Sequence, residues 1–401
     1  MMGKPNKRIS IVYFDAGSGH RSAARALERA LVIARPNWRI RMVNVTEVFA
    51  PHVRFHRIVC AGIDYFNWML KHEWVFDLRG LINLSLLFHD LLAPRDLMRI
   101  AAFWKSDLPD AVVSVTPMYN PVLYQSARLI NPRVRCITIP VDFEEAKPRY
   151  WFTPKVEQHY LLASERLVAQ AHLAGVPNSS IQSIPGMMID PGFYQPPLAE
   201  AERLAELTRL GLDPKQPTGL ISFGGQGSTI LRDIAVGLGR SRRQLNMIFL
   251  CGRSREAYAA LSTMETPYLK LVLGYQRDTP IRYYQLADFV IGKPGTMTIT
   301  EALVAQKPLI AIKSRGMRPV QAGNERWLQK RGLGVVVPPA SDIAQTVDRV
   351  LSDHAYSHRA ARAHHNGVFA AAELICTHLE AADASCSVRS ACTGAIVQVH
   401  A

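Results

Sequence analysis

A histidine at the end of a glycine turn is the first residue of this chain whose type and position could serve chemistry. Residues 9–14, ISIVYF, are typical of a strand, and the small-residue turn at 15–19, DAGSG, leads directly to His20 and an alanine- and arginine-rich helical segment. Where such a turn joins a strand to a helix N-terminus, free backbone N–H groups and the helix dipole favour an anion. The same dipole opposes a protonated imidazole, so we expect His20 to be neutral and available as a general base.

A second glycine turn, ISFGGQGST at residues 221–229, also ends a predicted strand and opens a helix. Its glycines let the backbone approach a diphosphate closely, and its polar side chains can donate hydrogen bonds to the phosphate oxygens. The residues concerned are Gly224, Gly225, Gln226, Gly227 and Ser228. Glycine turns of this kind also occur for packing alone, so the prediction depends on the strand ends that follow.

Three later runs place glycines and polar groups just beyond a predicted strand. They are CGRS at 251–254, with Gly252 and Arg253, GYQRD at 274–278, and GKPGTMTITEAL at 292–303. In an open α/β sheet, ligands bind at the carboxyl ends of the strands. The three runs therefore extend the predicted diphosphate site into a larger nucleotide site.

The run GKPGTMTITEAL is the most informative of them. Backbone N–H groups of Gly295-Thr296-Met297-Thr298 would face a ligand at another helix N-terminus. Glu301, on the first turns of that helix, can accept hydrogen bonds from both hydroxyls of a ribose. The alternative is a glutamate that the helix dipole alone favours at this position.

Short β-branched runs separated by helical stretches would position these groups. In the first half they are RISIVYF, WRIRMVNV, DAVVSVT, VRCITIPV, QHYLLAS and SIQSIPG, and in the second TGLISFG, QLNMIFLCG, LKLVLGY, DFVIGK, PLIAIKS and LGVVVPP. This alternation predicts an α/β protein with two Rossmann-like parallel-sheet domains facing a central cleft. A proline-rich linker near residue 195 divides residues 1–195 from 196–380, and residues 381–401 are expected to form a loose tail.

Residues 52–104 interrupt the alternation with an unusual number of aromatic side chains. Helical periodicity is expected there, and basic residues and histidines are interspersed. The bulky groups include Phe66, Trp68, Met69, Trp74, Val75 and Phe76. Two interpretations stay open: helices that pack under a sheet, or an apolar acceptor groove that also touches a bilayer interface.

Composition limits the compartment and the partners. The 401 residues carry a formal net charge of +14, and 48% of them are hydrophobic. A basic excess suits anionic lipid, a nucleotide-bearing substrate or nucleic acid, but no helix-turn-helix, RNP or zinc-finger signature favours nucleic acid. The six cysteines show no CxxC pair, and we find no signal peptide and no long apolar run. We therefore expect a cytoplasmic protein, peripheral to the inner face of the cell membrane.

Eight blocks, in order along both halves, resemble glycosyltransferase family 28, in its branch of monogalactosyldiacylglycerol synthases and processive diacylglycerol glucosyltransferases. They are DAGSGHRSAARAL, PDAVVSVTPMYNP, TIPVDFEEAKPRYWFTP, IPGMMIDPGF, SFGGQGS, CGRS, GKPGTMTITEAL and QAGNERWLQKRGLG. The resemblance implies a GT-B fold, with the acceptor in the N-terminal half and a nucleotide-sugar donor in the C-terminal half. It also implies an inverting UDP-sugar-dependent hexosyltransferase without cofactor or metal, in which UDP-sugar is a substrate. The sequence has no convincing DxD metal motif.

The resemblance also implies roles for residues that spacing alone does not assign. Tyr275 and Gln276 would border the uracil, and Gln321 and Asn324 would face the hydroxyls of the donor sugar. His20 and Asp142 would be the catalytic pair, with His20 removing the acceptor proton and Asp142 orienting or assisting it. Gly17, Gly19, Trp151 and Phe152 would lie on the acceptor side.

Two departures from the family pattern leave the donor sugar open. The sugar-facing stretch has Val320 where the family usually offers a second polar side chain, and Thr296 stands where a glycine is usual. The expected acceptor is a lipid hydroxyl, diacylglycerol-like, on an anionic membrane. The alternatives are N-acetylglucosaminyl transfer to a lipid-linked peptidoglycan precursor, a nucleotide-sugar 2-epimerase, and a non-catalytic UDP-sugar-binding protein.

Overall fold

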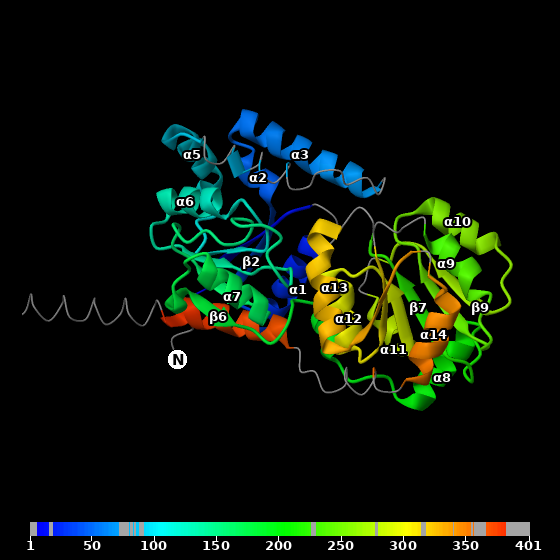
Figure 1. Ribbon diagram of the computed structural model, residues 1–401. Helices are drawn as coiled ribbons and strands as arrows, with labels where there is room; N and C mark the ends of the chain where they lie inside the picture. The colour runs from blue at the N-terminus through cyan, green and yellow to red at the C-terminus, as the bar shows by residue number, and fades with distance from the viewer. Residues whose placement is uncertain are drawn as a thin grey trace, which may run out of the picture.

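Two parallel six-stranded sheets, each covered by helices, form the two lobes of the molecule (Figure 1). The computed structural model describes residues 6–15, 19–71, 80, 83, 86–87, 92–225, 230–276, 280–313, 318–339, 341–353, 356 and 366–381. All twelve strands expected from the β-branched runs are present. The α/β prediction of two Rossmann-like domains is therefore confirmed.

The first sheet has the strand order β2-β1-β3-β4-β5-β6, and its neighbouring strands pair in parallel. Its strands are β1 (Arg8–Tyr13), β2 (Arg39–Asn44), β3 (Ala111–Ser114), β4 (Arg135–Thr138), β5 (His159–Leu162) and β6 (Ile181–Ser183). Its helical segments are α1 (Gly19–Ala34), α2 (Val45–Phe49), α3 (Val53–Lys71), α5 (Pro94–Ala101), η1 (Ala102–Ser106), α6 (Asn120–Ile130), α7 (Glu165–Leu173), η2 (Asn178–Ser180) and η3 (Pro191–Tyr194). Central β3 is buried along its whole length, as its unbroken apolar run requires.

The second sheet has the order β12-β11-β10-β7-β8-β9 and is also parallel. Its strands are β7 (Thr218–Ser222), β8 (Asn246–Leu250), β9 (Leu269–Leu273), β10 (Phe289–Gly292), β11 (Leu309–Ile312) and β12 (Gly334–Val337). Its helices are α8 (Glu200–Arg209), α9 (Leu231–Leu238), α10 (Arg255–Thr263), α11 (Ile281–Leu286), α12 (Thr296–Val304), α13 (Arg318–Arg331) and α14 (Ile343–Ser352).

Each sheet reverses its strand order at one point, between β1 and β3 in the first and between β10 and β7 in the second. The loops on either side of such a point diverge, which opens a crevice at the carboxyl edge of the sheet. The turn that ends at His20 follows β1, and the glycine turn at 223–229 follows β7. Topology therefore places both turns at the positions where α/β sheets bind ligands.

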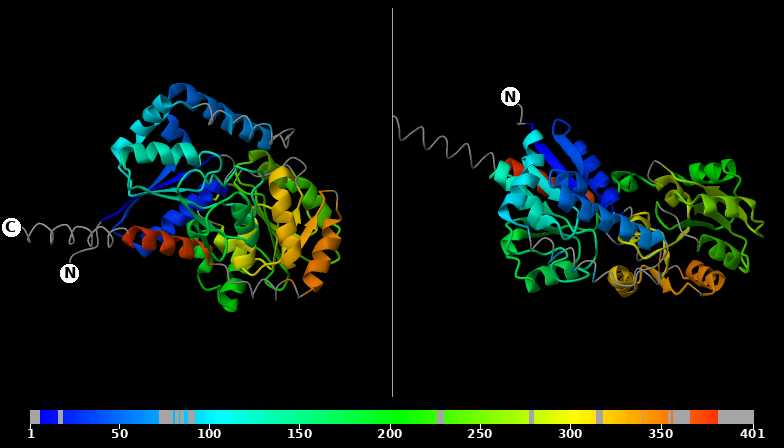
Figure 2. Two further views of the ribbon diagram at one scale, coloured as in Figure 1. Left: turned by 60° about the vertical axis from the view of Figure 1, so that its left-hand side comes forward. Right: turned by 90° about the horizontal axis from the view of Figure 1, so that it is seen from above.

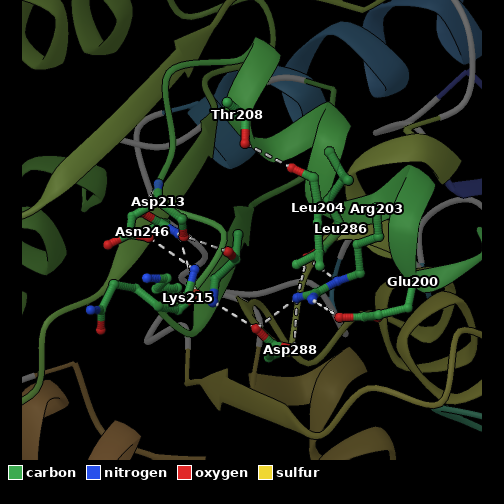
Figure 3. Close-up of polar contacts among 11 residues, drawn as sticks. Glu200, Arg203, Leu204, Thr208, Asp213, Lys215, Asn246, Leu286 and Asp288 are labelled. Atoms are coloured by element: carbon green, nitrogen blue, oxygen red, sulfur yellow. Dashed lines mark hydrogen bonds and ion pairs between the residues drawn. The ribbon is translucent and has the colours of Figure 1, made fainter.

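An arginine on α8 fixes the linker to the opposite edge of the second sheet (Figure 3). The Arg203 guanidinium donates to both carboxylate oxygens of Asp288, at 2.9 and 3.0 Å, and to the carbonyl of Leu286. Asp288 precedes β10 and also accepts a 2.8 Å hydrogen bond from the backbone N–H of Thr218 at the start of β7. Because this network lies at the amino ends of the strands, it holds the domain together without occupying the ligand edge.

The helix over residues 367–381 packs on the first domain, although the sequence prediction assigned everything from 196 to 380 to the second. Glu380 accepts a 2.7 Å hydrogen bond from Arg35, the residue that follows α1, and His378 is 2.7 Å from the Gln182 side chain in β6. Figure 1 shows this red helix beside β6. The 196–380 boundary is thus wrong at its end, because an amphipathic pattern shows that a helix needs a partner but not which sheet supplies it.

The aromatic segment forms helices on the outside of the first domain, where α3 and α5 lie (Figures 1 and 2). Exposed apolar side chains include Val53 (65%), Tyr65 (53%), Trp68 (45%) and Met98 (55%), whereas Phe66 packs against the core. Trp74, Val75, Phe76 and the Met69 side chain lie outside the described residues. In the described part of the chain, no helix is both long and apolar enough to cross a bilayer.

Candidate functional site

His20 lies at the crevice of the first sheet and is held in one tautomer. Its Nδ1 is 2.8 Å from the carbonyl oxygen of Val115, just beyond β3. A carbonyl can only accept, so Nδ1 carries the proton and Nε2 of the neutral ring keeps its lone pair. Burial lowers the pKa of His20 to about 4, against the opposing effect of the Val115 hydrogen bond. His20 is therefore neutral at pH 7 and able to accept a proton at Nε2.

Asp142 joins this histidine through the indole of Trp151. The Trp151 ring lies 6.2 Å from the His20 ring, centroid to centroid, and its Nε1–H donates to Asp142 Oδ2 at 3.0 Å. Burial raises the pKa of Asp142 to about 6, and the hydrogen bond from Trp151 opposes that rise. The three side chains form one cluster in which the indole lies beside the imidazole and fixes the carboxylate.

The other residues assigned to the acceptor side have different environments. Gly19 opens α1, and Gly17 lies outside the described residues. Trp151 and Phe152 are 0% and 1% exposed, so both are covered by other side chains. Glu145 holds the backbone of this pair, because its carboxylate accepts hydrogen bonds from the backbone N–H groups of both residues. The acceptor-side assignment stays a prediction. What the structure shows for Trp151 is its hydrogen bond to Asp142.

On the second domain, the turns after β7 and β8 pack directly against each other. Gly224 and Gly252 have φ values of +84° and +56°, a region that favours glycine. A Cβ on Gly252 would lie 2.7 Å from the carbonyl oxygen of Gly225, and the N–H of Arg253 donates to that same oxygen at 3.0 Å. The predicted diphosphate residues Gln226, Gly227 and Ser228 lie outside the described residues.

Arg253 and Tyr275 extend this surface. The Arg253 guanidinium carbon is 4.7 Å from the centre of the Tyr275 ring, and Tyr275 is 46% exposed. A cation over an aromatic ring fixes the plane of both groups. The neighbouring Gln276 donates weakly to the carbonyl of Gly274, at 3.3 Å. A flat exposed ring beside an arginine is suited to a nucleobase and phosphate, and the uracil border stays a prediction.

The N-terminus of α12 lies where β10 and β7 diverge. Gly292 ends β10 so close to β7 that an added Cβ would be 2.6 Å from the Ser222 carbonyl oxygen. Gly295 caps the helix with extended backbone, and Thr296 and Thr298 are buried in its first turn, whereas Met297 is only partly buried. The free N–H groups of this turn therefore face the same crevice as the glycine turn after β7.

Glu301 occupies the next turn of α12, where Tyr284 orients it. The hydroxyl of Tyr284, which is fully buried, donates to Glu301 Oε2 at 2.8 Å. Burial raises the pKa of Glu301 to about 7; the Tyr284 hydrogen bond lowers it and the nearby Asp190 carboxylate raises it. Burial disfavours the ionised form of Glu301. The predicted ribose contact would favour that form again, because hydroxyl donors stabilise the ionised carboxylate.

Helix α13 carries Gln321 and Asn324, the two residues predicted to face the donor sugar, and Asn324 contacts the start of α12. The Asn324 amide donates to the Pro294 carbonyl at 3.0 Å and to the Thr296 hydroxyl at 3.3 Å. Among the described residues, Gln321 Oε1 and Glu325 Oε1 are buried acceptors with no hydrogen-bond partner. Residues four apart share a helix face, so these acceptors lie one turn apart on the same side of α13.

Sequence reasoning missed Tyr284 and Glu325. Tyr284 lies on α11, outside every strand-end run, and nothing in its spacing ties it to Glu301. Glu325 follows Asn324 directly and approaches Lys313, with 3.8 Å between Oε2 and Nζ. Its position four residues after Gln321, which places both side chains on one face of a helix, was the signal that could have identified it. Within the described residues, no group of three or more His, Cys, Asp or Glu side chains is placed to hold a metal ion.

Comparison with known proteins names the family of the second domain. Residues 224–375 match the glycosyltransferase family 28 C-terminal domain. The protein is a glycosyltransferase. This glycosyltransferase is 25% identical over 373 residues to a probable chloroplastic monogalactosyldiacylglycerol synthase 2 of Oryza sativa subsp. indica, covering 87% of this chain and 74% of that one.

A bacterial relative and two solved structures extend the comparison. The processive diacylglycerol beta-glucosyltransferase of Staphylococcus carnosus is 26% identical over 256 residues, 63% of this chain and 62% of that one. MurG of Acinetobacter baumannii gives a TM-score of 0.57 at 14% identity, covering 93% of this chain and all of that one. The calicheamicin glycosyltransferase CalG4 gives 0.56 at 16% identity, covering 95% and 98%. These structures confirm the GT-B fold.

Proposed function

We propose that this glycosyltransferase moves a hexose from a UDP-sugar to a lipid hydroxyl at a membrane surface, with inversion at C1. The observation that carries the chemistry is the fixed tautomer of His20, whose Nδ1 is committed to Val115 at 2.8 Å. Its Nε2 is then the proton acceptor that an alcohol nucleophile requires, since a hydroxyl is too weak an acid to ionise at pH 7.

In the proposed reaction, the acceptor oxygen bonds to C1 of the hexose as the bond from C1 to the diphosphate oxygen breaks. The acceptor proton passes to His20 Nε2, and the departing electron pair leaves on UDP. Asp142, held by Trp151, stabilises the resulting imidazolium by its charge. The N–H groups at the start of α12 stabilise the leaving diphosphate, so we propose that the reaction needs no metal ion.

The second domain supplies the proposed donor contacts. Glu301 would accept from the ribose hydroxyls, and the Arg253–Tyr275 pair would border the uracil and phosphates. The two buried acceptors on α13, Gln321 Oε1 and Glu325 Oε1, need hydroxyl or N–H donors, which a hexose provides. Acceptors without partners favour a hydroxyl-rich ligand at this position.

The lipid acceptor and the membrane surface are proposed from the outer helices and from the relatives. Exposed Tyr65 and Trp68, stacked with their ring centres 6.1 Å apart, lie on α3. Arg54 and Arg57 are exposed on the same helix, and the chain as a whole carries +14. Aromatic and basic side chains together suit the interface of an anionic bilayer. We place the protein in the cytoplasm, at the inner face of the membrane.

Radiolabelled UDP-glucose, UDP-galactose and UDP-N-acetylglucosamine, incubated with anionic vesicles that contain diacylglycerol, test the proposal. Label in the organic phase, with and without a chelator, is the expected result, and a His20→Ala control should lose it. If the label passes only to a lipid-linked peptidoglycan precursor, that precursor replaces diacylglycerol as the proposed acceptor. Epimerised nucleotide sugar, or binding without turnover, would overturn the transferase mechanism for this site.

A further inference from the structure

The two domains meet where α13 packs on the segment that follows Asp142. The rings of Phe143 and Trp327 are stacked, with centroids 4.1 Å apart and planes inclined by 8°. Beside them, Glu144 forms an ion pair with Arg326 of α13. We call Phe143, Glu144, Gly323, Arg326 and Trp327 the α13 junction. Figure 1 shows α13 on the side of the second domain that faces the first.

Gly323 shows how closely the two segments approach. A Cβ at this position would lie 2.3 Å from the carboxyl carbon of Glu144 and 2.5 Å from its Oε1. Glu144 is also drawn toward its own domain, with Arg166 of α7 3.8 Å from its Oε2. The junction therefore combines an aromatic stack, a charge pair and a contact so close that a side chain at position 323 would displace the Glu144 carboxylate.

The same short segments carry groups from both halves of the proposed site. Asn324 lies one turn before Trp327 on α13 and donates to Pro294 and Thr296 at the start of α12. Asp142 precedes Phe143 directly and is held by Trp151 beside His20. An α-helix is stiff over one turn, so a shift of Trp327 is a shift of Asn324. The junction thus connects the donor-sugar contacts to the catalytic cluster.

We propose that Trp327 is a positioning residue: through its stack on Phe143 it sets the distance between the donor-sugar contacts on α13 and the Asp142–Trp151–His20 cluster. This inference rests on the proposed hexose transfer. Group transfer between two bound substrates depends steeply on the alignment of the reacting atoms, and a displacement of about 1 Å can cost up to about a hundredfold in rate. Trp327 touches neither substrate in this scheme and acts through the two segments that it joins.

The test compares Trp327→Leu, Trp327→Phe and Phe143→Leu for transfer at saturating donor and acceptor, and for donor affinity. Trp327→Leu should lower kcat for transfer by about tenfold or more while the donor Kd changes less than about threefold. Trp327→Phe should retain most of the wild-type kcat, because an aromatic ring remains to stack on Phe143. The double variant Trp327→Leu, Phe143→Leu should be no slower than either single variant, since one shared contact is lost only once.

Gly323→Ala is the second perturbation, because alanine stabilises a helix interior relative to glycine. The variant should stay folded, displace Glu144 and lower kcat. Phe369→Leu is the matched control. The Phe369 ring contacts the Tyr194 ring, with centroids 5.6 Å apart, and neither residue belongs to the α13 junction, so this variant should keep the wild-type kcat.

The outcomes separate this inference from the function on which it rests. A wild-type protein that transfers no hexose overturns the proposed function. A wild-type protein that transfers hexose, with Trp327→Leu equally fast or with additive losses in the double variant, overturns the role of Trp327 alone. A kcat loss that Trp327→Phe fails to restore would also contradict it.

Discussion

Replacing Glu301 with glutamine removes one ionisable group from α12 while keeping its shape and its capacity to accept from the Tyr284 hydroxyl, now 2.8 Å from Oε2. Burial raises the pKa of this carboxyl from 4.5 to about 7, so the folded protein holds the proton more tightly than the unfolded chain. At about 1.4 kcal/mol per tenfold change in proton affinity, the ionised form costs about 3 kcal/mol of folding stability.

The sign of the pH dependence follows from linkage. Between pH 4.5 and about 7 the folded state binds more protons at Glu301 than the unfolded state does, so the free energy of unfolding falls as the pH rises through this range. Glu301→Gln removes that fall. The variant should differ least from the wild type at pH 5, where the wild type carries about 1 kcal/mol of this cost, and gain most at pH 8, where the wild type carries the full cost.

Donor binding should change in the opposite direction. With a pKa of about 7, about one tenth of Glu301 is ionised at pH 6 and about nine tenths at pH 8, so the free wild type should bind UDP-sugar about tenfold more weakly at pH 6. Glu301→Gln should bind weakly at both values.

Thermal unfolding from pH 5 to 8, with and without UDP-sugar, measures both effects in one series. The matched control is Glu256→Gln, an exposed first-turn glutamate of α10 in the same domain, which should show neither effect. A Glu301→Gln protein that gains no stability at pH 8, or that binds donor as tightly as the wild type there, would refute the reasoning.

Three further substitutions address the other groups of the site. His20→Gln should lower transfer by about 10²- to 10⁴-fold, the usual contribution of a general base, while the thermal shift on adding donor stays unchanged. Trp151→Phe should raise the pKa of Asp142 above its present value of about 6, because the hydrogen bond that opposes burial is lost, and should move the acid limb of the kcat profile to higher pH. Gly252→Ala should lower stability by about 1–3 kcal/mol and weaken donor binding, since its φ is +56° and an added Cβ meets the neighbouring glycine turn at 2.7 Å.

Each substitution has an outcome that contradicts its premise. Wild-type turnover in His20→Gln removes the base assignment, and an unmoved acid limb in Trp151→Phe separates Asp142 from the chemistry. For Gly252→Ala the control is Gly62→Ala, where an added Cβ meets nothing within 4 Å. Equal effects of the two alanines would show that crowding at the glycine turns is not the cause.

Periodicity was sufficient to predict the strands and their parallel arrangement, because a strand buried on both faces must be a short, unbroken apolar run. The position of His20 was also predictable, since the carboxyl edge of a parallel sheet is fixed by chain direction. Its tautomer was not, because the Val115 carbonyl that sets it comes from a different strand connection, 95 residues away.

The contacts that tune the site join residues far apart in sequence. Tyr284 reaches Glu301 from another helix, and the Phe143–Trp327 stack joins two domains. Composition gives no signal for such pairs, since tyrosine and tryptophan also occur in cores that carry no functional site. The same holds for Trp151, whose full burial is a fact of packing rather than of local sequence.

The return of residues 367–381 to the first domain bears on how the chain is made. The hydrogen bond between Arg35 and Glu380 joins residues 345 positions apart, and the one between Gln182 of β6 and His378 joins residues 196 positions apart. During synthesis the second domain can close before this helix emerges, whereas the first must wait with an uncovered apolar surface. A fragment cut at residue 195 would keep that exposed surface permanently, and we expect it to aggregate unless the segment 366–381 is supplied as a separate peptide.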